Sequence, residues 1–217
     1  TIAIGYQAPL TGENAQYGIQ FRNSATLAVD EFNKSGKLPG VTVQLKFEDS
    51  KGDAKEGVNL GRKFSDDPSI VAAIGDFSST VSLAAAQVYA QTKLAQLSQT
   101  ASHPDFVKIS PYQFRNITTM SYESPLVAKW ALANGAKKIA VVAIQNDWWQ
   151  SALSNFVDAV KAGGGEVSVR IGEITRISTP EHFLSRFNHF TSRTDCLSQN
   201  GIHFSFTGHR LRQRNGQ

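Results

Sequence analysis

Two hydroxyl side chains, Ser79 and Thr80, stand where an apolar run gives way to an alanine-rich helical segment. The run, Ile70 to Ile74, is continuous, which is typical of a strand in a parallel sheet that is covered on both faces. Backbone N–H groups at a helix N-terminus bind anions, and neighbouring hydroxyls add hydrogen bonds. The pattern therefore predicts a carboxylate site, although serine at a helix start is equally typical of ordinary capping.

Two further hydroxyls, Thr100 and Ser102, follow the next strand candidate along the chain, Leu94 to Ser98. Parallel strands bring their carboxyl ends to one edge of a sheet, and open α/β sheets bind ligands outside that edge. We therefore expect all four hydroxyls at one edge, where they suit the carboxylate of an amino acid or of a similar small molecule.

Strand and helix patterns alternate along most of the chain and indicate which elements position these hydroxyls. A strand at Thr1–Gln7 precedes a helix, and another strand with alternating apolar residues follows it, from Val41 to Phe47. The apolar face expected for this first helix comprises Phe21, Ala25, Ala28 and Phe32. Gly36 is expected to end the helix. Regular alternation requires right-handed crossovers and predicts a doubly wound parallel sheet with helices on both faces.

Later helices are expected at about Ala54 to Phe64, Ser79 to Lys93, Ser121 to Asn134 and Trp149 to Ala162. Asp53 is expected to cap the first of these, Ser78, Ser79 and Thr80 offer hydroxyls to cap the second, and Pro125 falls in the first turn of the third. Later strands are expected at Lys138–Ile144 and Val167–Ile171. The fold class predicted is α/β, with two such lobes and a cleft between them.

The lobes are predicted at residues 1–117 and 118–217, with Tyr112–Thr119 as the passage between them. The second lobe is incomplete, and its part from 177 to 217 is atypical, because Lys disappears there while Arg, His, Ser and Phe increase. A divergent helix–strand pair and a shifted sequence both remain open for this segment. The pair would use the helical spacing of Phe183, Phe187 and Phe190 and the alternation of Ile202, Phe204 and Phe206.

Composition excludes several classes of protein. With 41% hydrophobic and 18% charged residues, the 217-residue chain can bury a core. The net charge of +4 is spread along the chain without a Lys/Arg run, so no nucleic-acid partner is predicted. No apolar stretch is long enough to cross a bilayer, and strand residues instead of a signal peptide open the chain, as in a processed protein. A single cysteine, Cys196, leaves the compartment open.

Six segments in unbroken order over about residues 1–176 resemble the branched-chain amino-acid binding proteins of ABC transporters, which are type I periplasmic binding proteins. The segments are IAIGYQAPLTGENAQYG (2–18), LAVDEFNKSG (27–36), VQLKFEDSKGDAKEGVNLGRKF (43–64), AAIGDFSSTVSLAAAQVYAQ (72–91), LSQTASHPDF (97–106) and KKIAVVAIQNDWW (137–149), and the short stretch FRNITT (114–119) fits the first crossover between lobes. The resemblance implies two lobes that close on a ligand and a receptor that passes this ligand to a membrane permease.

The resemblance also implies roles for individual residues. Ser79, Thr100 and Ser102 occupy positions where the family binds the amino-acid head group, with Thr100 in place of a smaller residue. Tyr17 and Phe77 fall where the family lines the side-chain pocket.

In the second lobe, Trp148 falls where many members of the family place an aromatic cap over the ligand. Tyr122 is a further candidate for the cleft, and core packing is the alternative for each of these aromatics. The acid that binds the ligand's ammonium comes from the later second lobe in the family, and Ile177–Gln217 shows no counterpart to it.

The resemblance implies a receptor in the periplasm, or anchored by lipid on the extracellular face, without cofactor, metal or catalytic activity. Its ligand is expected to be a branched-chain or other amino acid, and alternatively an aromatic carboxylate or amide.

A nucleotide-dependent enzyme is the first rival, but the first strand–helix junction reads PLTGE (9–13) in place of G-x-G-x-x-G. His103 lacks a triad partner by sequence, and His182 and His189 lack zinc spacing. A transcription repressor with this core would need an N-terminal helix-turn-helix.

Overall fold

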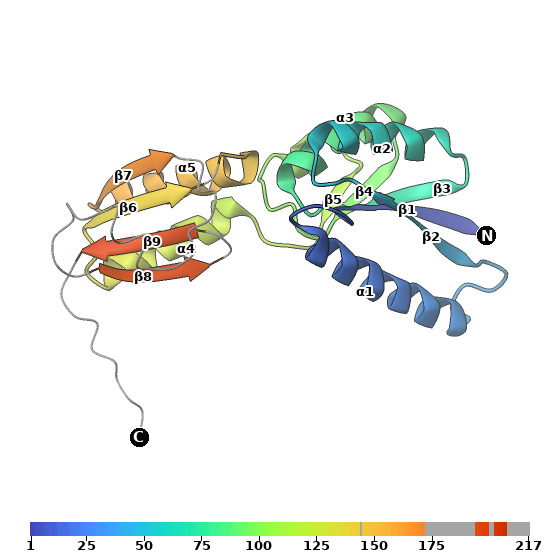
Figure 1. Ribbon diagram of the computed structural model, residues 1–217, viewed down its shortest axis with the longest axis horizontal. Coiled ribbons are helices and arrows are strands. Elements are labelled where there is room, and N and C mark those ends of the chain that lie inside the picture. The colour runs from blue at the N-terminus through green and yellow to red at the C-terminus, as the bar shows by residue number, and fades with distance from the viewer. Residues whose placement is uncertain (144, 172–193, 200–201, 208–217) are drawn as a thin grey trace, which may run out of the picture. The chain divides into compact units, whose positions relative to one another are not determined.

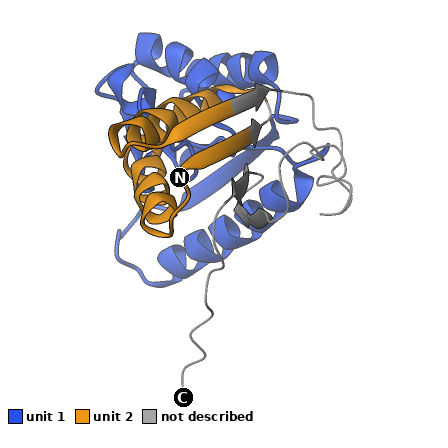
Figure 2. Cartoon of the chain, turned by 90° about the vertical axis from the view of Figure 1, so that its left-hand side faces the viewer, with its two compact units in different colours: residues 1–119 blue, residues 120–217 orange. Residues whose placement is uncertain are grey.

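The computed structural model describes residues 1–143, 145–171, 194–199 and 202–207. The chain divides into two compact units, Thr1–Thr119 and Met120–Gln217, which are coloured separately in Figure 2. This division lies two residues from the boundary expected at 117. Within the described ranges, no helix has the length and apolarity that a membrane span requires.

Unit 1 is a five-stranded parallel sheet with helices on both faces (Figure 1). Its strands are β1 (Ile2–Ala8), β2 (Val43–Asp49), β3 (Ile70–Ile74), β4 (Ala95–Ser98) and β5 (Gln113–Arg115). Its helices are α1 (Ala15–Lys34), α2 (Ala54–Asp66) and α3 (Ser79–Thr92), with a short 3₁₀ helix, η1 (Phe106–Lys108). The strand order β2-β1-β3-β4-β5 reverses direction between β1 and β3, which is where open α/β sheets bind ligands. The expected doubly wound parallel fold is confirmed for this unit.

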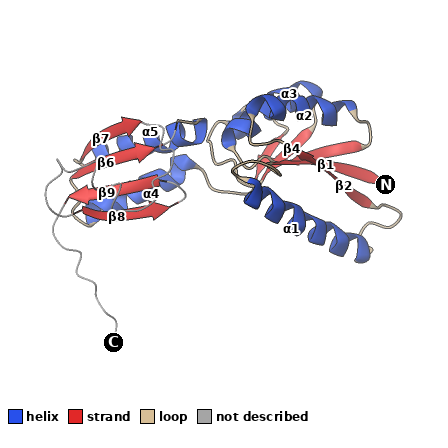
Figure 3. Ribbon diagram, in the orientation of Figure 1, coloured by secondary structure: helices blue, strands red, loops and turns tan. Residues whose placement is uncertain are grey.

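One face of the sheet in unit 1 is covered by α2 and α3 (Figure 3). Phe64 of α2 and Tyr89 of α3 pack there against Ala3 and Ala73 in one apolar cluster. Gly5 of β1 lies against the Phe64 ring, because a Cβ atom at this position would be 2.5 Å from it. The helices therefore pack closely on the sheet along β1 and β3.

The opposite face carries α1, and its packing differs from the sequence prediction. Phe21, Ala25, Val29 and Asn33 are the half-buried positions of the helix's central and last turns, whereas Phe32 is exposed. Asn33 determines which face of α1 is turned toward the sheet. Its side-chain amide donates to the Val43 carbonyl at 2.8 Å and accepts the Val43 N–H at 2.9 Å. The expected face with Ala28 and Phe32 is therefore wrong, since hydrogen bonding to β2 fixes the rotation of α1.

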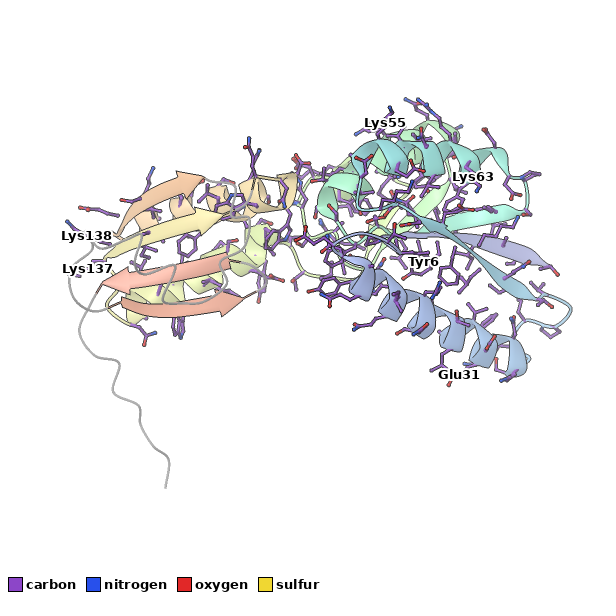
Figure 4. All side chains as sticks on the ribbon, viewed as in Figure 1. Tyr6, Glu31, Lys55, Lys63, Lys137 and Lys138 are labelled. Carbon is purple, nitrogen blue, oxygen red and sulfur yellow. The ribbon has the colours of Figure 1, made fainter. Side chains whose placement is uncertain are left out.

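Tyr6 of β1 lies on the α1 side of the sheet, as Figure 4 shows, with Phe47 beside it at a ring-centroid distance of 5.1 Å. Towards β4 and β5 this face is less covered. Leu97 and Phe114 pair with each other in register and remain exposed to solvent among the described residues.

Helix ends in unit 1 follow the predicted signals closely. Asp53 caps α2, because its Oδ1 accepts the Glu56 N–H at 2.9 Å. Gly36 follows α1 with φ +63°, a left-handed conformation that glycine adopts without strain. The hydroxyl of Ser78, the N-cap of α3, makes no capping hydrogen bond, so the predicted capping by Ser78 is wrong.

Unit 2 contains a four-stranded mixed sheet in the order β7-β6-β9-β8. Its elements are α4 (Met120–Ala133), β6 (Lys138–Ala143), α5 (Asp147–Ala162), β7 (Glu166–Ile171), β8 (Thr194–Gln199) and β9 (Ile202–Thr207). β6 and β7 are parallel, but β9 is antiparallel to both β6 and β8. The wholly parallel second sheet that we expected is therefore wrong.

The antiparallel pairing has a simple cause in the sequence. Only two residues separate β8 from β9, and a two-residue connection can join only antiparallel strands. The strand expected from the alternation of Ile202, Phe204 and Phe206 is confirmed, whereas the helix expected at Phe183 to Phe190 lies outside the described residues. Pro125 lies within α4, beyond the first turn where we had placed it.

We expect Asp53→Ala to lower the free energy of unfolding by about 1 kcal/mol, because the Glu56 N–H at the start of α2 loses its acceptor. Urea unfolding followed by circular dichroism measures this change. Lys55→Ala is the matched control, since Lys55 is an exposed residue of the same helical turn (Figure 4). Equal stability of the two variants would contradict a capping role for Asp53.

Candidate ligand-binding site

Two loops at the carboxyl edge of the first sheet are joined by the side chain of Thr100. Its hydroxyl lies 3.0 Å from the Asp76 carbonyl and 2.9 Å from the Phe77 carbonyl, and it donates to this pair. These carbonyls belong to the loop between β3 and α3, whereas Thr100 follows β4. The expected proximity of the two loops is thus present within unit 1, but the Thr100 hydroxyl is used to join them.

Ser79 is the first residue of α3 and lies in the loop region fixed by Thr100. Its side chain is 3% exposed, and its hydroxyl oxygen has no hydrogen-bond partner among the described residues. A buried hydroxyl without a partner costs about 1–3 kcal/mol. The first turn of α3 therefore contains a hydroxyl suited to an incoming acceptor, beside a helix N-terminus that favours anions.

Ser102 and Thr80 complete the set of predicted hydroxyls. Ser102 is buried in the loop after β4, and Thr80 is half-buried in the first turn of α3. Both residues make interactions in the structure. All four hydroxyl residues accordingly lie at the carboxyl edge of one sheet, two in the first turn of α3 and two on the loop after β4.

The loop between β1 and α1 reaches the same edge and is positioned by Asp49 at the end of β2. Asp49 accepts the N–H groups of Leu10 at 2.8 Å and Thr11 at 3.2 Å, and the Thr11 hydroxyl donates to it at 2.5 Å. Burial opposes ionisation of Asp49, but these bonds and the Lys51 N–H outweigh it, so the pKa of its carboxyl lies below the usual value. The loop is therefore fixed by an ionised carboxylate.

The start of α1 brings an aromatic side chain to the β3–α3 loop. Tyr17 stacks on Phe77 with ring centroids 4.6 Å apart and planes 11° from parallel. Tyr17 is 40% exposed, so this aromatic pair is accessible to solvent through Tyr17. Gly18, the next residue, lies so close to the Pro9 carbonyl that a Cβ would clash with it, which fixes α1 against the loop. The structure thus brings Tyr17 and Phe77 together, and their role in lining a side-chain pocket stays a prediction.

Asp76 lies beneath these loops and was missed by the sequence analysis. Its side chain is fully buried, and Oδ1 accepts the Ser78 N–H at 3.2 Å. Its N–H donates to the Ser82 hydroxyl at 2.9 Å. Burial raises the pKa of Asp76 to about 6, although the Ser50 hydroxyl and the N–H groups of Ser78 and Phe77 favour the carboxylate. A charged residue two positions after the end of an apolar strand was the signal available in the sequence.

Glutamine side chains support the same loop from the neighbouring strands. The Gln96 amide of β4 donates to the Gly75 carbonyl at 3.0 Å, and Gly75 N–H donates to the Leu97 carbonyl at 3.0 Å. On β1, Gln7 accepts the Tyr89 hydroxyl at 2.9 Å. The turn that leads from β3 into α3 is therefore fixed by polar groups of β4, whereas Gln7 ties α3 itself to β1.

In unit 2, the two predicted aromatics differ in environment. Tyr122 of α4 is 62% exposed. Trp148 is half-buried at the start of α5 and packs against the core, whereas Trp149 is part of that core. Asn146 caps α5 by accepting the Trp149 N–H at 2.8 Å, which turns adjacent tryptophans to different surroundings. Trp148 and Tyr122 remain predictions as ligand contacts.

Comparison with known proteins identifies the family. The sequence profile of the periplasmic binding protein family matches residues 1–174. The chain belongs to this family. The Leu/Ile/Val-binding protein BraC3 of Rhizobium johnstonii is 32% identical over 171 residues, which are 75% of this chain and 45% of that protein.

Solved structures of similar proteins agree with this assignment. One from Rhodospirillum rubrum, whose name assigns it to branched-chain amino acid ABC transport, is 44% identical with a TM-score of 0.58, over 78% of this chain and 49% of that one. A solute binding protein of Rhodopseudomonas palustris BisB5 in complex with 3,4-dihydroxybenzoic acid is 25% identical with a TM-score of 0.72, over 78% of this chain and 46% of that one. This periplasmic binding protein chain thus spans about half the length of these relatives.

The raised pKa of Asp76 makes the stability of this binding protein depend on pH. From about pH 4 to about 6 the folded state retains a proton that the unfolded state releases, so stability falls as pH rises through this window. We expect Asp76→Asn to remove this fall, because the amide does not ionise. Between pH 4 and pH 7.5, the free energy of unfolding of the variant is expected to rise by about 2–3 kcal/mol relative to that of the wild type.

Urea unfolding at both pH values measures the effect on stability. Asp30→Asn, an exposed substitution on α1, is the matched control and is expected to follow the wild type. A variant Asp76→Asn with the same pH dependence as the wild type would show that Asp76 is ionised without cost.

Proposed function

We propose that this periplasmic binding protein is the extracytoplasmic receptor of an ABC transporter and binds a small carboxylate, foremost a branched-chain or other amino acid, for delivery to a membrane permease. The buried Ser79 hydroxyl without a partner, at the N-terminus of α3, carries this proposal. The family match and the amino-acid-binding names of the relatives support the ligand class. Its location outside the cytoplasmic membrane follows from the proposed transport role.

The carboxylate end of the ligand has a defined place in this proposal. The side chain of Ser78, the N-cap of α3, makes no capping hydrogen bond. The backbone N–H groups of the first turn of α3 are therefore able to bind an anion. The Ser79 hydroxyl adds a charge-assisted hydrogen bond, which is stronger than one between neutral groups. Ser102, on the loop after β4, and Thr80, in the first turn of α3, border this position. The Thr100 hydroxyl joins the loops after β3 and β4 through its hydrogen bonds to the Asp76 and Phe77 carbonyls.

The apolar part of the ligand is assigned to the aromatic pair formed by Tyr17 and Phe77. An exposed aromatic side chain contributes apolar contact area without fixing one side-chain shape. Trp148 and Tyr122 are proposed to add contacts from unit 2. The acid for a ligand ammonium is expected from the later part of the second lobe, and Ile177–Gln217 shows no counterpart to it by sequence.

A second candidate is a receptor for aromatic carboxylates. The parallel arrangement of Tyr17 and Phe77 suits stacking on a flat ring, and the relative from Rhodopseudomonas palustris was solved with 3,4-dihydroxybenzoic acid. This candidate uses the same carboxylate position and needs no partner for an ammonium. In both cases we propose binding without turnover, as in the substrate-binding proteins of the family.

A ligand panel tests the proposal and separates the two candidates. We expect L-leucine, L-isoleucine, L-valine or 4-hydroxybenzoate to raise the melting temperature in a saturable manner, because a ligand that binds only the folded state stabilises it. Calorimetry then gives the affinity, and chromatography of the recovered ligand tests for turnover. Conversion of a ligand to product would refute the receptor function, as would the absence of any shift.

For the ligand that binds, we expect Ser79→Ala to weaken affinity by about 1–3 kcal/mol, because a charged acceptor loses a hydrogen bond. Ser24→Ala on the exposed part of α1 removes a hydroxyl elsewhere and is the matched control. An unchanged affinity of Ser79→Ala would exclude Ser79 from the site.

A further inference from the structure

The carboxyl group of Asp76 lies in the turn that leads into α3, two residues before the N-cap. Its side chain has no exposure to solvent. Oδ1 accepts the Ser78 N–H at 3.2 Å, whereas Oδ2 is buried without a hydrogen bond of normal geometry. This buried carboxyl is therefore held within the segment that forms the ligand site, by the N–H of the N-cap residue of α3.

Main-chain bonds connect Asp76 directly to the residues of the site. Its carbonyl lies 3.0 Å from the Thr100 hydroxyl, which joins the loops after β3 and β4. Its N–H lies 2.9 Å from the hydroxyl of Ser82 in the first turns of α3. Any charge on Asp76 consequently acts on the same helix N-terminus as the carboxylate of a bound ligand.

We propose that Asp76 makes the site sensitive to ligand charge, so that a carboxylate binds together with a proton on this residue. This inference rests on the proposed function. An ionised Asp76 and a ligand carboxylate would be two negative charges near one helix end, where burial weakens the screening by water. Neutral Asp76 removes this repulsion and leaves the positive potential of the helix end for the ligand.

The groups around Asp76 do not neutralise it. Burial together with the charge of Asp76 raises the pKa of the Tyr6 and Tyr89 phenols, that of Tyr6 to about 12. Asp49 at the end of β2 adds a further negative charge. Among the described residues, no lysine or arginine forms an ion pair with Asp76.

Arg115 and His103, two further ionisable groups near these loops, are directed elsewhere. The Arg115 guanidinium of β5 donates to the carbonyls of Ala101, His103 and Pro104. His103, next to Ser102, accepts the Asp105 N–H through Nδ1. His103 is therefore the neighbouring side chain to replace in a control variant.

The sign of the expected pH dependence follows from linkage. A bound carboxylate raises the proton affinity of Asp76, and by reciprocity a proton on Asp76 raises the affinity for the carboxylate. Burial already raises the pKa of Asp76 to about 6, so the neutral form is populated at mildly acidic pH. Affinity accordingly falls as pH rises from about 5.5 to about 7.5.

Calorimetric titrations of the full chain with L-leucine and with 4-hydroxybenzoate at these pH values test the inference. Both probes keep their carboxylate ionised over this range, so the protein alone supplies the pH dependence. The wild type is expected to lose affinity on the order of fivefold between the two pH values. Asp76→Asn is expected to bind with the higher affinity at both.

Matched variants and proton counting sharpen the test. His103→Gln and Asp30→Asn are expected to keep the pH dependence of the wild type. Titrations in buffers of different ionisation enthalpy are expected to show proton uptake on binding by the wild type and none by Asp76→Asn.

The outcomes distinguish this inference from the proposed function. Binding of a probe by the wild type without pH dependence, or with a dependence that Asp76→Asn retains, overturns the role of Asp76 and leaves the receptor function intact. Failure of both probes and of the other panel ligands to bind at any pH overturns both.

Discussion

A single threonine hydroxyl connects the parts of this site within the first sheet. Thr100 follows β4, and its hydroxyl donates to the adjacent carbonyls of Asp76 and Phe77 after β3. The two loops that carry the predicted hydroxyls therefore keep a fixed separation, and the first turn of α3 keeps a fixed direction. A binding site for a small carboxylate depends on this kind of positioning, because a hydrogen bond weakens steeply when its geometry is lost.

The surrounding polar groups serve the same loops. Asp49 fixes the β1–α1 loop with an ionised carboxylate, and this loop leads into the helix that brings Tyr17 to Phe77. Asp76 lies beneath the β3–α3 turn, and its ionised form costs stability because burial removes it from water. Two carboxyl groups at one sheet edge thus have opposite pKa shifts, which arise from hydrogen bonding in one case and from burial in the other.

Much of the fold was predictable from local patterns. The apolar run at Ile70–Ile74, the cap at Asp53 and the glycine at 36 act through neighbouring residues, and the structure confirms each of them. The rotation of α1 was not predictable, because it depends on hydrogen bonds between Asn33 and the distant Val43. The mixed sheet of unit 2 was missed because apolar and polar residues alternate only weakly along β8 in the sequence. Once β8 is recognised as a strand, its two-residue separation from β9 requires antiparallel pairing.

Sequence reasoning placed the hydroxyls of the site at one edge but could not assign their partners. Thr100 stays a predicted ligand residue, and only tertiary contacts reveal that its hydroxyl joins two loops. Asp76 was overlooked because the burial of a carboxyl depends on tertiary packing, including that of β4, which lies about twenty residues further along the chain. The family resemblance supplied the roles of Tyr17 and Phe77, and the structure adds their mutual stacking.

The central claim is that a ligand carboxylate binds at the N-terminus of α3. A crystal structure of this chain grown with the panel ligand of highest affinity tests this claim most directly. We expect the ligand carboxylate within hydrogen-bond distance of the Ser79 hydroxyl and of backbone N–H groups in the first turn of α3, with its apolar part against Tyr17 and Phe77. A ligand bound elsewhere, or with its carboxylate directed away from α3, would contradict the account.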